Sequence, residues 1–133
     1  MKPLLYIDTS AAIRIELGDH DGPELKKFVA AQRLSGVMLC SSRLLELECR
    51  RAAVRLEAEG FDSKEVATFA ANCRLLPIDD DVWRTALGIT QTVKSLDAIH
   101  LATCALVPNV RLLTSDITMR TVAKALGIVV AEP

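Results

Sequence analysis

Short apolar runs alternate with longer amphipathic segments along the whole chain. Each run has the length of a strand, is apolar at successive positions and ends at polar or turn residues, which is typical of strands buried on both faces. The predicted strands are Leu4–Ile7, Val37–Cys40, Leu75–Ile78, Arg111–Thr114 and Ile128–Val130. Because Pro77 lacks a backbone N–H, we expect the third of these strands at an edge of the sheet.

The segments between these strands have the spacing and the boundary residues of helices. We expect the Ser41-Ser42 pair and Ser95 to cap two of them. The predicted helices are Ala11–Leu17, Glu24–Leu34, a long helix from the Ser41-Ser42 cap to Glu59, Asp62–Asn72, Asp79–Thr90, Leu96–Leu106 and Asp116–Leu126. Strands that alternate with helices predict a single three-layer α/β/α domain over residues 1–133, with a short, mostly parallel sheet flanked by helices.

Composition narrows the class of protein without naming a function. The 133 residues are 50% hydrophobic and 25% charged, as in ordinary soluble domains, and only 4% are aromatic, so the core must be aliphatic. Sixteen Lys and Arg against 17 Asp and Glu give a formal net charge of −1. This balance excludes a polycation that binds phosphate backbones non-specifically, and it fits a binder of lipid surfaces poorly.

The cysteines and the apolar runs favour a cytoplasmic protein without a membrane anchor. The four cysteines contain no C-x-x-C pair, which argues against a zinc knuckle and a redox motif, and their aliphatic neighbours predict core positions. No apolar run reaches the ~18–20 residues that span a bilayer. The run Leu4–Ile7 ends at Asp8 and is too short for the core of a signal peptide.

Acidic side chains follow several of the predicted strands. Asp8 and Asp116 come after two strands, Glu46 and Glu48 lie on the helix after another, and Asp97 begins a mostly apolar helix. Ligands of open α/β sheets bind at the carboxyl ends of the strands, so these acids are candidates for one site. Clustered carboxylates repel by ~4 kcal/mol per pair at an effective dielectric constant of 20 and therefore need protons or a cation. Oxygen ligands suit Mg²⁺, and the lack of a Cys/His set argues against zinc.

Each acid also fits a purely structural role. An Asp after a strand is commonly a turn or cap residue, and Asp116 stands where a helix cap is expected. On the long helix, Glu46 and Glu48 flank the apolar stripe on opposite sides, so periodicity does not choose between them. Glu46 has Arg50 at i+4, a favourable pairing on a helix surface.

Four segments together resemble the PIN-domain family, and more narrowly the toxins of VapBC toxin–antitoxin pairs. They are Leu4–Ala11, Ser41–Ala52, Ser95–Thr103 and Leu112–Asp116, which occur in the order expected for the family and span almost the whole chain. The resemblance implies an endoribonuclease that depends on Mg²⁺ or Mn²⁺. Its metal-binding and catalytic acids map to Asp8, Glu48, Asp97 and Asp116, because the family pattern aligns on Glu48 rather than Glu46.

Residues near these acids in the sequence are candidates for supporting roles, and the resemblance implies partners. Thr9, Ser10 and Ser115 adjoin the acids and are expected to hold waters or carboxylates, and Arg14 is expected near the mouth of the site. The implied partners are RNA, a small antitoxin protein and a second copy of the chain. The alternative within the same family is a degenerate PIN domain that binds RNA or a protein without cutting it.

Other polar residues have simpler interpretations. His100 lies three residues after Asp97 among apolar neighbours, which favours a hydrogen-bonded, half-buried histidine over a catalytic one. The Asp19–Asp21 loop lies among glycine and proline and is expected to be solvated. Four arginines on the long helix are candidates for phosphate contacts or for a solvated face: Arg43, Arg50, Arg51 and Arg55.

Overall fold

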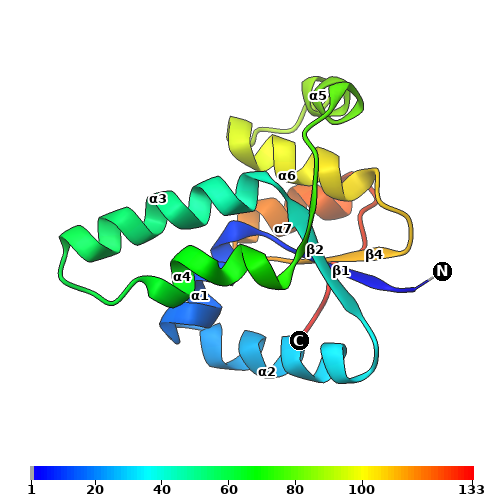
Figure 1. Cartoon of the computed structure of the whole chain (residues 1–133). Helices are drawn as coiled ribbons and strands as arrows, with labels where there is room; N and C mark the ends of the chain where they lie inside the picture. Colours follow the sequence, from blue (N-terminus) through cyan, green and yellow to red (C-terminus); the bar gives the residue numbers. More distant parts are fainter. Residues whose placement is uncertain (1) are drawn as a thin grey trace.

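The computed structural model describes residues 2–133 and has an α/β architecture in which strands and helices alternate (Figure 1). The strands are β1 (Leu4–Ile7), β2 (Met38–Ser42), β3 (Arg74–Leu76) and β4 (Val110–Leu113). The helices are α1 (Thr9–Leu17), α2 (Gly22–Leu34), α3 (Leu44–Ala58), α4 (Lys64–Thr68), the 3₁₀ turn η1 (Phe69–Asn72), α5 (Asp80–Leu87), α6 (Ser95–Ala105) and α7 (Ile117–Ala125).

The four strands form one parallel sheet in the order β3-β2-β1-β4. Leu5 of the central strand β1 pairs with Leu39 on one side and Arg111 on the other. Since all strands run in the same direction, their carboxyl ends meet at one edge of the sheet. The predicted parallel α/β sheet is confirmed, and β3 lies at an edge as Pro77 indicated.

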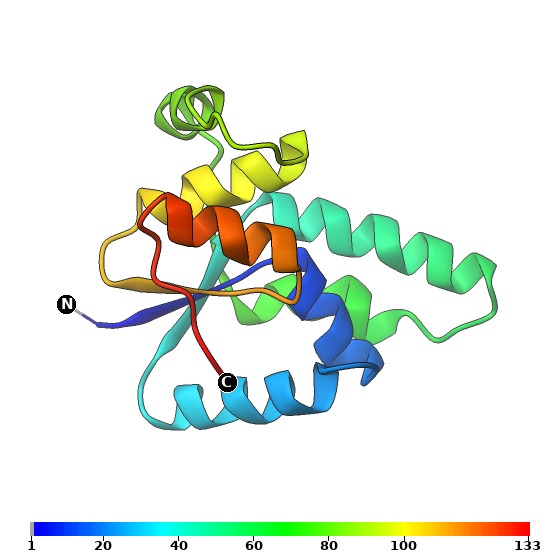
Figure 2. The same cartoon turned by 180° about the vertical axis from the view of Figure 1, so that it is seen from behind.

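Helices cover both faces of the sheet and make three layers. Leu5 and Ile7 of β1 pack into one apolar cluster with α1, α2 and α3, whereas Tyr6 points to the other face and packs with α6 and α7. This alternation follows from the two-residue repeat of a strand. Figures 1 and 2 show the sheet between these two layers, with α5 projecting beyond α6.

The predicted last strand, Ile128–Val130, is wrong, because this segment pairs with the sheet at a single residue. Only one bridge forms, between Leu112 and Val130, with hydrogen bonds from Leu112 N–H to Val129 and from Ala131 N–H to Leu112. Ala131 is buried in the cluster of the α2 layer, so the chain leaves the sheet edge after a single pairing (Figure 2). The predicted helix Asp62–Asn72 is likewise divided into α4 and η1.

Two predicted helix caps are displaced. Ser41 and Ser42 are buried residues of β2, and Arg43 occupies the cap position of α3, although Ser42 Oγ accepts a hydrogen bond from Leu44 N–H at 3.0 Å. Ser95 is the first residue of α6 rather than its cap, because Lys94 holds the extended cap position. Asp116 does cap α7, as expected.

The cysteines occupy core positions, as their aliphatic neighbours predicted. All four cysteines are free; Cys40, Cys49 and Cys104 are buried and Cys73 is half-buried. Burial in apolar surroundings raises the pKa of Cys49 to about 12, which keeps its thiol protonated and unreactive at neutral pH. Within residues 2–133, no helix is both long and apolar enough to cross a membrane.

The close contact between α1 and α2 gives a test of the packing. A Cβ atom added to Gly22, the first residue of α2, would lie 2.0 Å from the backbone oxygen of Arg14, whereas one added to Gly88 would meet no atom closer than 3.5 Å. We expect Gly22→Ala to lower the free energy of unfolding by ~1–3 kcal/mol, as overpacking does. Gly88→Ala, the matched control, should change it by less than ~0.5 kcal/mol. Urea unfolding measures both, and equal effects would contradict the contact.

Candidate active site

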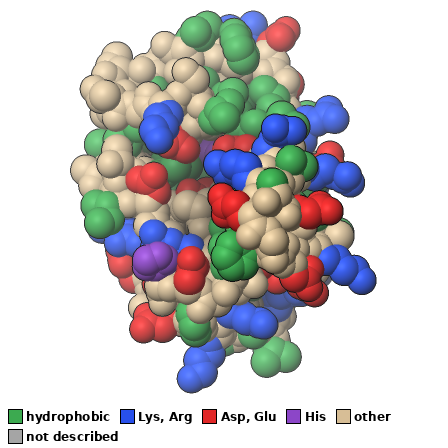
Figure 3. Space-filling model, turned by 90° about the vertical axis from the view of Figure 1, so that its left-hand side faces the viewer, with side chains coloured by type: hydrophobic (Ala, Val, Ile, Leu, Met, Phe, Trp, Pro, Cys, Tyr) green, Lys and Arg blue, Asp and Glu red, His purple; other side chains and the backbone are tan. Residues whose placement is uncertain are grey.

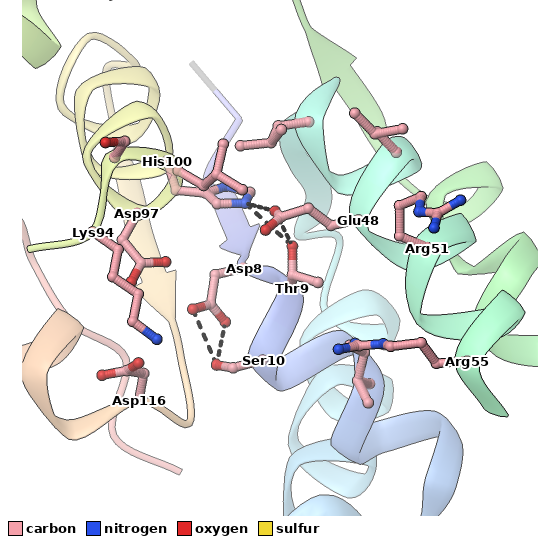
Figure 4. Close-up of a pocket in the computed structure, with 15 residues that line it drawn as sticks. Asp8, Thr9, Ser10, Glu48, Arg51, Arg55, Lys94, Asp97, His100 and Asp116 are labelled. Atoms are coloured by element: carbon pink, nitrogen blue, oxygen red, sulfur yellow. Dashed lines mark hydrogen bonds and ion pairs between the residues drawn. The ribbon is translucent and has the colours of Figure 1, made fainter. Parts of the chain in front are cut away.

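A pocket of about 650 Å³ opens at the carboxyl ends of the strands, and all four predicted acids line it. Asp8 follows β1, Glu48 lies on α3, Asp97 lies in the first turn of α6 and Asp116 precedes α7. Figure 3 shows the hollow with acidic side chains on its walls and basic ones around it, and Figure 4 shows the four acids converging. Glu46, by contrast, is exposed and does not line this pocket.

Asp8 is the most deeply buried of the acids, at 3% exposure. Its carboxylate accepts hydrogen bonds from both neighbouring hydroxyls, Ser10 at 2.9 Å and Thr114 at 2.7 Å, and from the backbone N–H of Ala11 at 3.0 Å. Burial raises the pKa of Asp8, and the bonds from Thr114 and Ala11 partly offset that rise. Because Asp8 also caps α1, the start of that helix and the acid are fixed together.

Glu48 reaches the pocket from α3 and is held by two partners. Its Oε1 accepts a hydrogen bond from Thr9 Oγ1 at 2.6 Å and lies 2.7 Å from His100 Nε2 (Figure 4). Burial raises the pKa of this carboxyl, but the hydrogen bonds from His100 and Thr9 outweigh burial and leave the pKa below its usual value. Glu48 is therefore an ionised carboxylate anchored to β1–α1 and to α6.

Asp97 and Asp116 face one another across the other side of the pocket. Asp116 uses Oδ1 to accept the N–H of Met119, whereas the carboxylate of Asp97 accepts no hydrogen bond from any of residues 2–133. Burial raises the pKa of Asp97, and the negative charges of Asp116 and Glu48 raise it further. Asp97 thus adds a carboxylate without a hydrogen-bond donor next to the other acids of the pocket.

This donor set fits a hard divalent cation better than a soft one. Carboxylate and hydroxyl oxygens predominate on the polar lining of the pocket, and oxygen ligands are those that Mg²⁺ and Mn²⁺ prefer. The acids line the same pocket but do not form a preformed metal site. Across residues 2–133, no three His, Cys, Asp or Glu side chains lie close enough together to bind one metal ion. The convergence of four carboxylates in one pocket is the observation that favours a cation here.

Basic and apolar side chains surround the acids. Arg51 and Arg55 line the pocket from α3, and Lys94 lies across from them beside Asp97 (Figure 4). The lysine charge lowers the pKa of Asp97 slightly against the larger effects of burial and neighbouring acids. Leu47 and Leu96 add exposed apolar surface to the lining, at 59% and 47% exposure.

The supporting residues predicted from the sequence separate into two groups. Thr9 and Ser10 bind Glu48 and Asp8 directly. Ser115 Oγ instead donates to Asp21 at 3.2 Å, and Arg14 is paired with the same aspartate at 3.0 Å, outside the lining of the pocket. Asp21 is therefore not a solvated loop residue as expected, since it ties the α1–α2 loop to the segment before α7.

Sequence reasoning missed Thr114 and Lys94, and it predicted a hydrogen-bonded His100 without naming its partner. Thr114 binds Asp8, His100 binds Glu48, and Lys94 lies between two acids. His100 is buried at 1% exposure, deeper than the half-buried position expected for it. Its spacing from Asp97 on one helix was a usable signal, but its partner lies 52 residues away and no local pattern indicates it. The roles of the four acids as metal ligands stay predictions.

Comparison with known proteins agrees with this geometry. The sequence matches the PIN domain family over residues 5–125. It is 32% identical over 133 residues to ribonuclease VapC46 of Mycobacterium tuberculosis (strain ATCC 25618 / H37Rv), with 97% of each chain covered. It is 26% identical over 137 residues to ribonuclease VapC47 of Mycobacterium tuberculosis (strain CDC 1551 / Oshkosh), which covers 98% of this chain and 97% of the relative. The resemblance inferred from four short segments is confirmed, and the chain belongs to the PIN-domain family, among its VapC-like members.

Proposed function

We propose that the protein is an endoribonuclease that depends on Mg²⁺ or Mn²⁺ and serves as the toxin of a toxin–antitoxin pair. The observation that carries this proposal is the convergence of four carboxylates, from four separate segments, in one pocket with basic side chains around it. The relatives that are named ribonucleases cover nearly the whole chain, which supports RNA as the substrate.

Asp8, Glu48 and Asp97 are the residues that would hold the divalent cation, and Asp116 would complete the set. A divalent cation in such a site supplies an activated water and neutralises charge on the phosphate. The protein's part is to keep the carboxylates in place. Asp8 is fixed by three donors and Glu48 by two, so neither has to be immobilised when the site is loaded.

Lys94, Arg51 and Arg55 would hold the RNA. They provide positive charge on two sides of the acidic pocket, and an arginine fork suits a phosphodiester. The acids of the pocket repel the phosphates of RNA, and the positive charges of these three side chains offset that repulsion at the rim. A near-neutral chain can therefore bind RNA locally without being a polycation.

The antitoxin and the homodimer are further parts of the proposal. Leu47 and Leu96 expose apolar surface at the same pocket, which supports a protein segment that covers it when the toxin is inhibited. A segment seated there would also block RNA from the acids. Dimerisation is implied by the family resemblance alone, and sedimentation equilibrium of the purified chain tests it.

Removing one charge tests the metal-dependent reaction. Asp97→Asn keeps the shape of the side chain and breaks no hydrogen bond of residues 2–133. We expect RNA cleavage to fall by more than ~100-fold, beyond the ~10–100-fold typical of groups that only support a metal ligand. The unfolding midpoint without metal should not fall, because Asp97 is repelled by Asp116.

Chelation is the companion measurement. Cleavage by the wild-type protein should stop in EDTA and return with Mg²⁺ or Mn²⁺ in a gel assay of defined RNAs. Cleavage that persists in EDTA would contradict metal dependence. Metal binding by calorimetry without any cleavage would instead favour the non-catalytic binding module.

The two glutamates of α3 provide a matched pair. Glu48→Gln removes a charge inside the pocket, whereas Glu46→Gln removes the same charge two residues away on the exposed surface. We expect Glu48→Gln to lose cleavage and Mn²⁺ binding together, and Glu46→Gln to keep both within about two-fold of wild type. Equal losses of cleavage and Mn²⁺ binding in both variants would show that Glu48 is not a specific metal ligand and that only the total charge of α3 matters.

The arginines of α3 test the RNA contact. Arg55 lines the pocket, while Arg50 on the same helix does not. Arg55→Gln should raise the KM for RNA by about 2–5-fold, the size expected when an exposed ion pair of ~0.5–1 kcal/mol is lost, and should leave kcat unchanged. The effect should shrink at high salt. Arg50→Gln is the control, and a similar rise in KM for it would mean that the whole helix attracts RNA non-specifically.

A further inference from the structure

A buried line of hydrogen bonds leads through the protein interior to Glu48. The backbone N–H of Ser42 donates to the hydroxyl of Tyr6 at 3.1 Å, that hydroxyl lies 2.7 Å from Nδ1 of His100, and His100 Nε2 lies 2.7 Å from Glu48 Oε1. The side chains of Tyr6 and His100 are almost completely buried, at 0% and 1% exposure. Their rings meet edge to face, with centroids 5.8 Å apart, so the imidazole cannot turn without disturbing the core.

The direction of these bonds follows from the donors available. The Tyr6 oxygen already accepts the N–H of Ser42, so its own hydrogen is free to be donated. Two acceptors lie beside it, the hydroxyl of Ser41 and Nδ1 of His100, and the separation of 2.7 Å from Nδ1 favours the histidine. A ring that accepts at Nδ1 carries its hydrogen on Nε2. That hydrogen points to Glu48 Oε1, which accepts when the carboxyl is ionised.

The line of bonds leaves the two oxygens of Glu48 with different surroundings. Oε1 receives both Thr9 and His100, whereas Oε2 accepts no hydrogen bond from residues 2–133. A free glutamate side chain loses roughly 1.5–2 kcal/mol of rotamer entropy when it is fixed. In this protein Thr9 and His100 fix it in advance, with one oxygen bound to the protein and the other available in the pocket.

We propose that His100 is a positioning residue: Tyr6 fixes it in the tautomer with hydrogen on Nε2, and it holds Glu48 so that Oε2 is available to the divalent cation. The inference rests on the proposed function in one respect, that Glu48 is a ligand of this cation. The new element is that two core residues, Tyr6 on β1 and His100 on α6, set the orientation of Glu48 on α3.

The tautomer is measured on the wild-type protein without metal. Long-range ¹⁵N NMR of the histidine rings should show hydrogen on Nε2 of His100 and none on Nδ1. His20, the other histidine, is exposed, with its Nε2 3.9 Å from Asp19 Oδ2, and provides the reference for a ring on the surface. A hydrogen on Nδ1, alone or together with one on Nε2, would overturn the assignment. This measurement needs no variant and decides the tautomer whether or not the variants fold.

Two amides of different length test the positioning. His100→Gln can place an N–H near the position of Nε2 and donate to Glu48, whereas the shorter side chain of His100→Asn cannot reach beyond the position of Nδ1. We expect His100→Asn to weaken Mn²⁺ binding by about 10–100-fold, the usual effect of removing a group that orients a metal ligand. His100→Gln should restore the affinity to within a few-fold of wild type.

Activity provides the second readout. Because His100 is buried, the loss in His100→Asn should appear in kcat, with the KM for RNA unchanged, and His100→Gln should recover kcat. Thermal unfolding compares the stability of the two variants. Wild-type Mn²⁺ affinity in His100→Asn, or equally weak binding in both variants, would reduce His100 to a packing residue and overturn the proposal.

The outcomes separate this inference from the proposed function. If the wild-type protein binds Mn²⁺ but cleaves no RNA, the proposed function fails, while the affinities and the ¹⁵N tautomer still decide the role of His100. If it binds no Mn²⁺ at all, the positioning role for a metal ligand is overturned as well.

Discussion

The carboxylate of Asp8 lies at the end of the central strand with 3% of the residue exposed, and a charge removed from water is tolerated only where donors replace the lost water. Its donors come from α1 and from Thr114 after β4. The need to satisfy this one carboxylate therefore joins two neighbouring strands and the first helix at the edge where the pocket opens. Removing these donors would affect the fold and the site together.

The other acids of the pocket are held to different degrees, and the difference has a chemical meaning. Glu48 has one carboxylate oxygen bound by the protein, Asp116 uses one to cap α7, and the carboxylate of Asp97 accepts no hydrogen bond from the described chain. Bound oxygens fix geometry, while unbound ones leave negative charge that favours a cation. The same distribution explains how a chain with a net charge of −1 combines an acidic pocket with basic side chains at its rim.

Most of the fold could be predicted because it follows from local patterns. The apolar runs Leu4–Ile7 and Arg111–Thr114 coincide with β1 and β4 to within one residue, and glycines and prolines mark most helix ends. The errors lie where a distant contact outweighs the local signal. Ser41 looks like a helix cap, yet it belongs to β2 and donates to the backbone oxygen of Ile7 at 2.6 Å. The apolar run Ile128–Val130 predicts a strand, but a single bridge between Val130 and Leu112 joins this segment to the sheet.

By itself, the sequence determined the strand–helix alternation and the family resemblance, and it identified Asp8, Asp97 and Asp116 as candidate site residues, because residue type and position at a strand end or a helix start are local properties. The choice between Glu46 and Glu48 as the glutamate that lines the pocket was made by tertiary structure. Both flank the apolar stripe of α3, and only the contacts with Thr9 of α1 and His100 of α6 hold one of them in the pocket. Tertiary structure also decided which residues His100 contacts. Its partners Tyr6 and Glu48 are 94 and 52 residues away, and hydrogen bonds over such separations form only when the folded core brings the elements together.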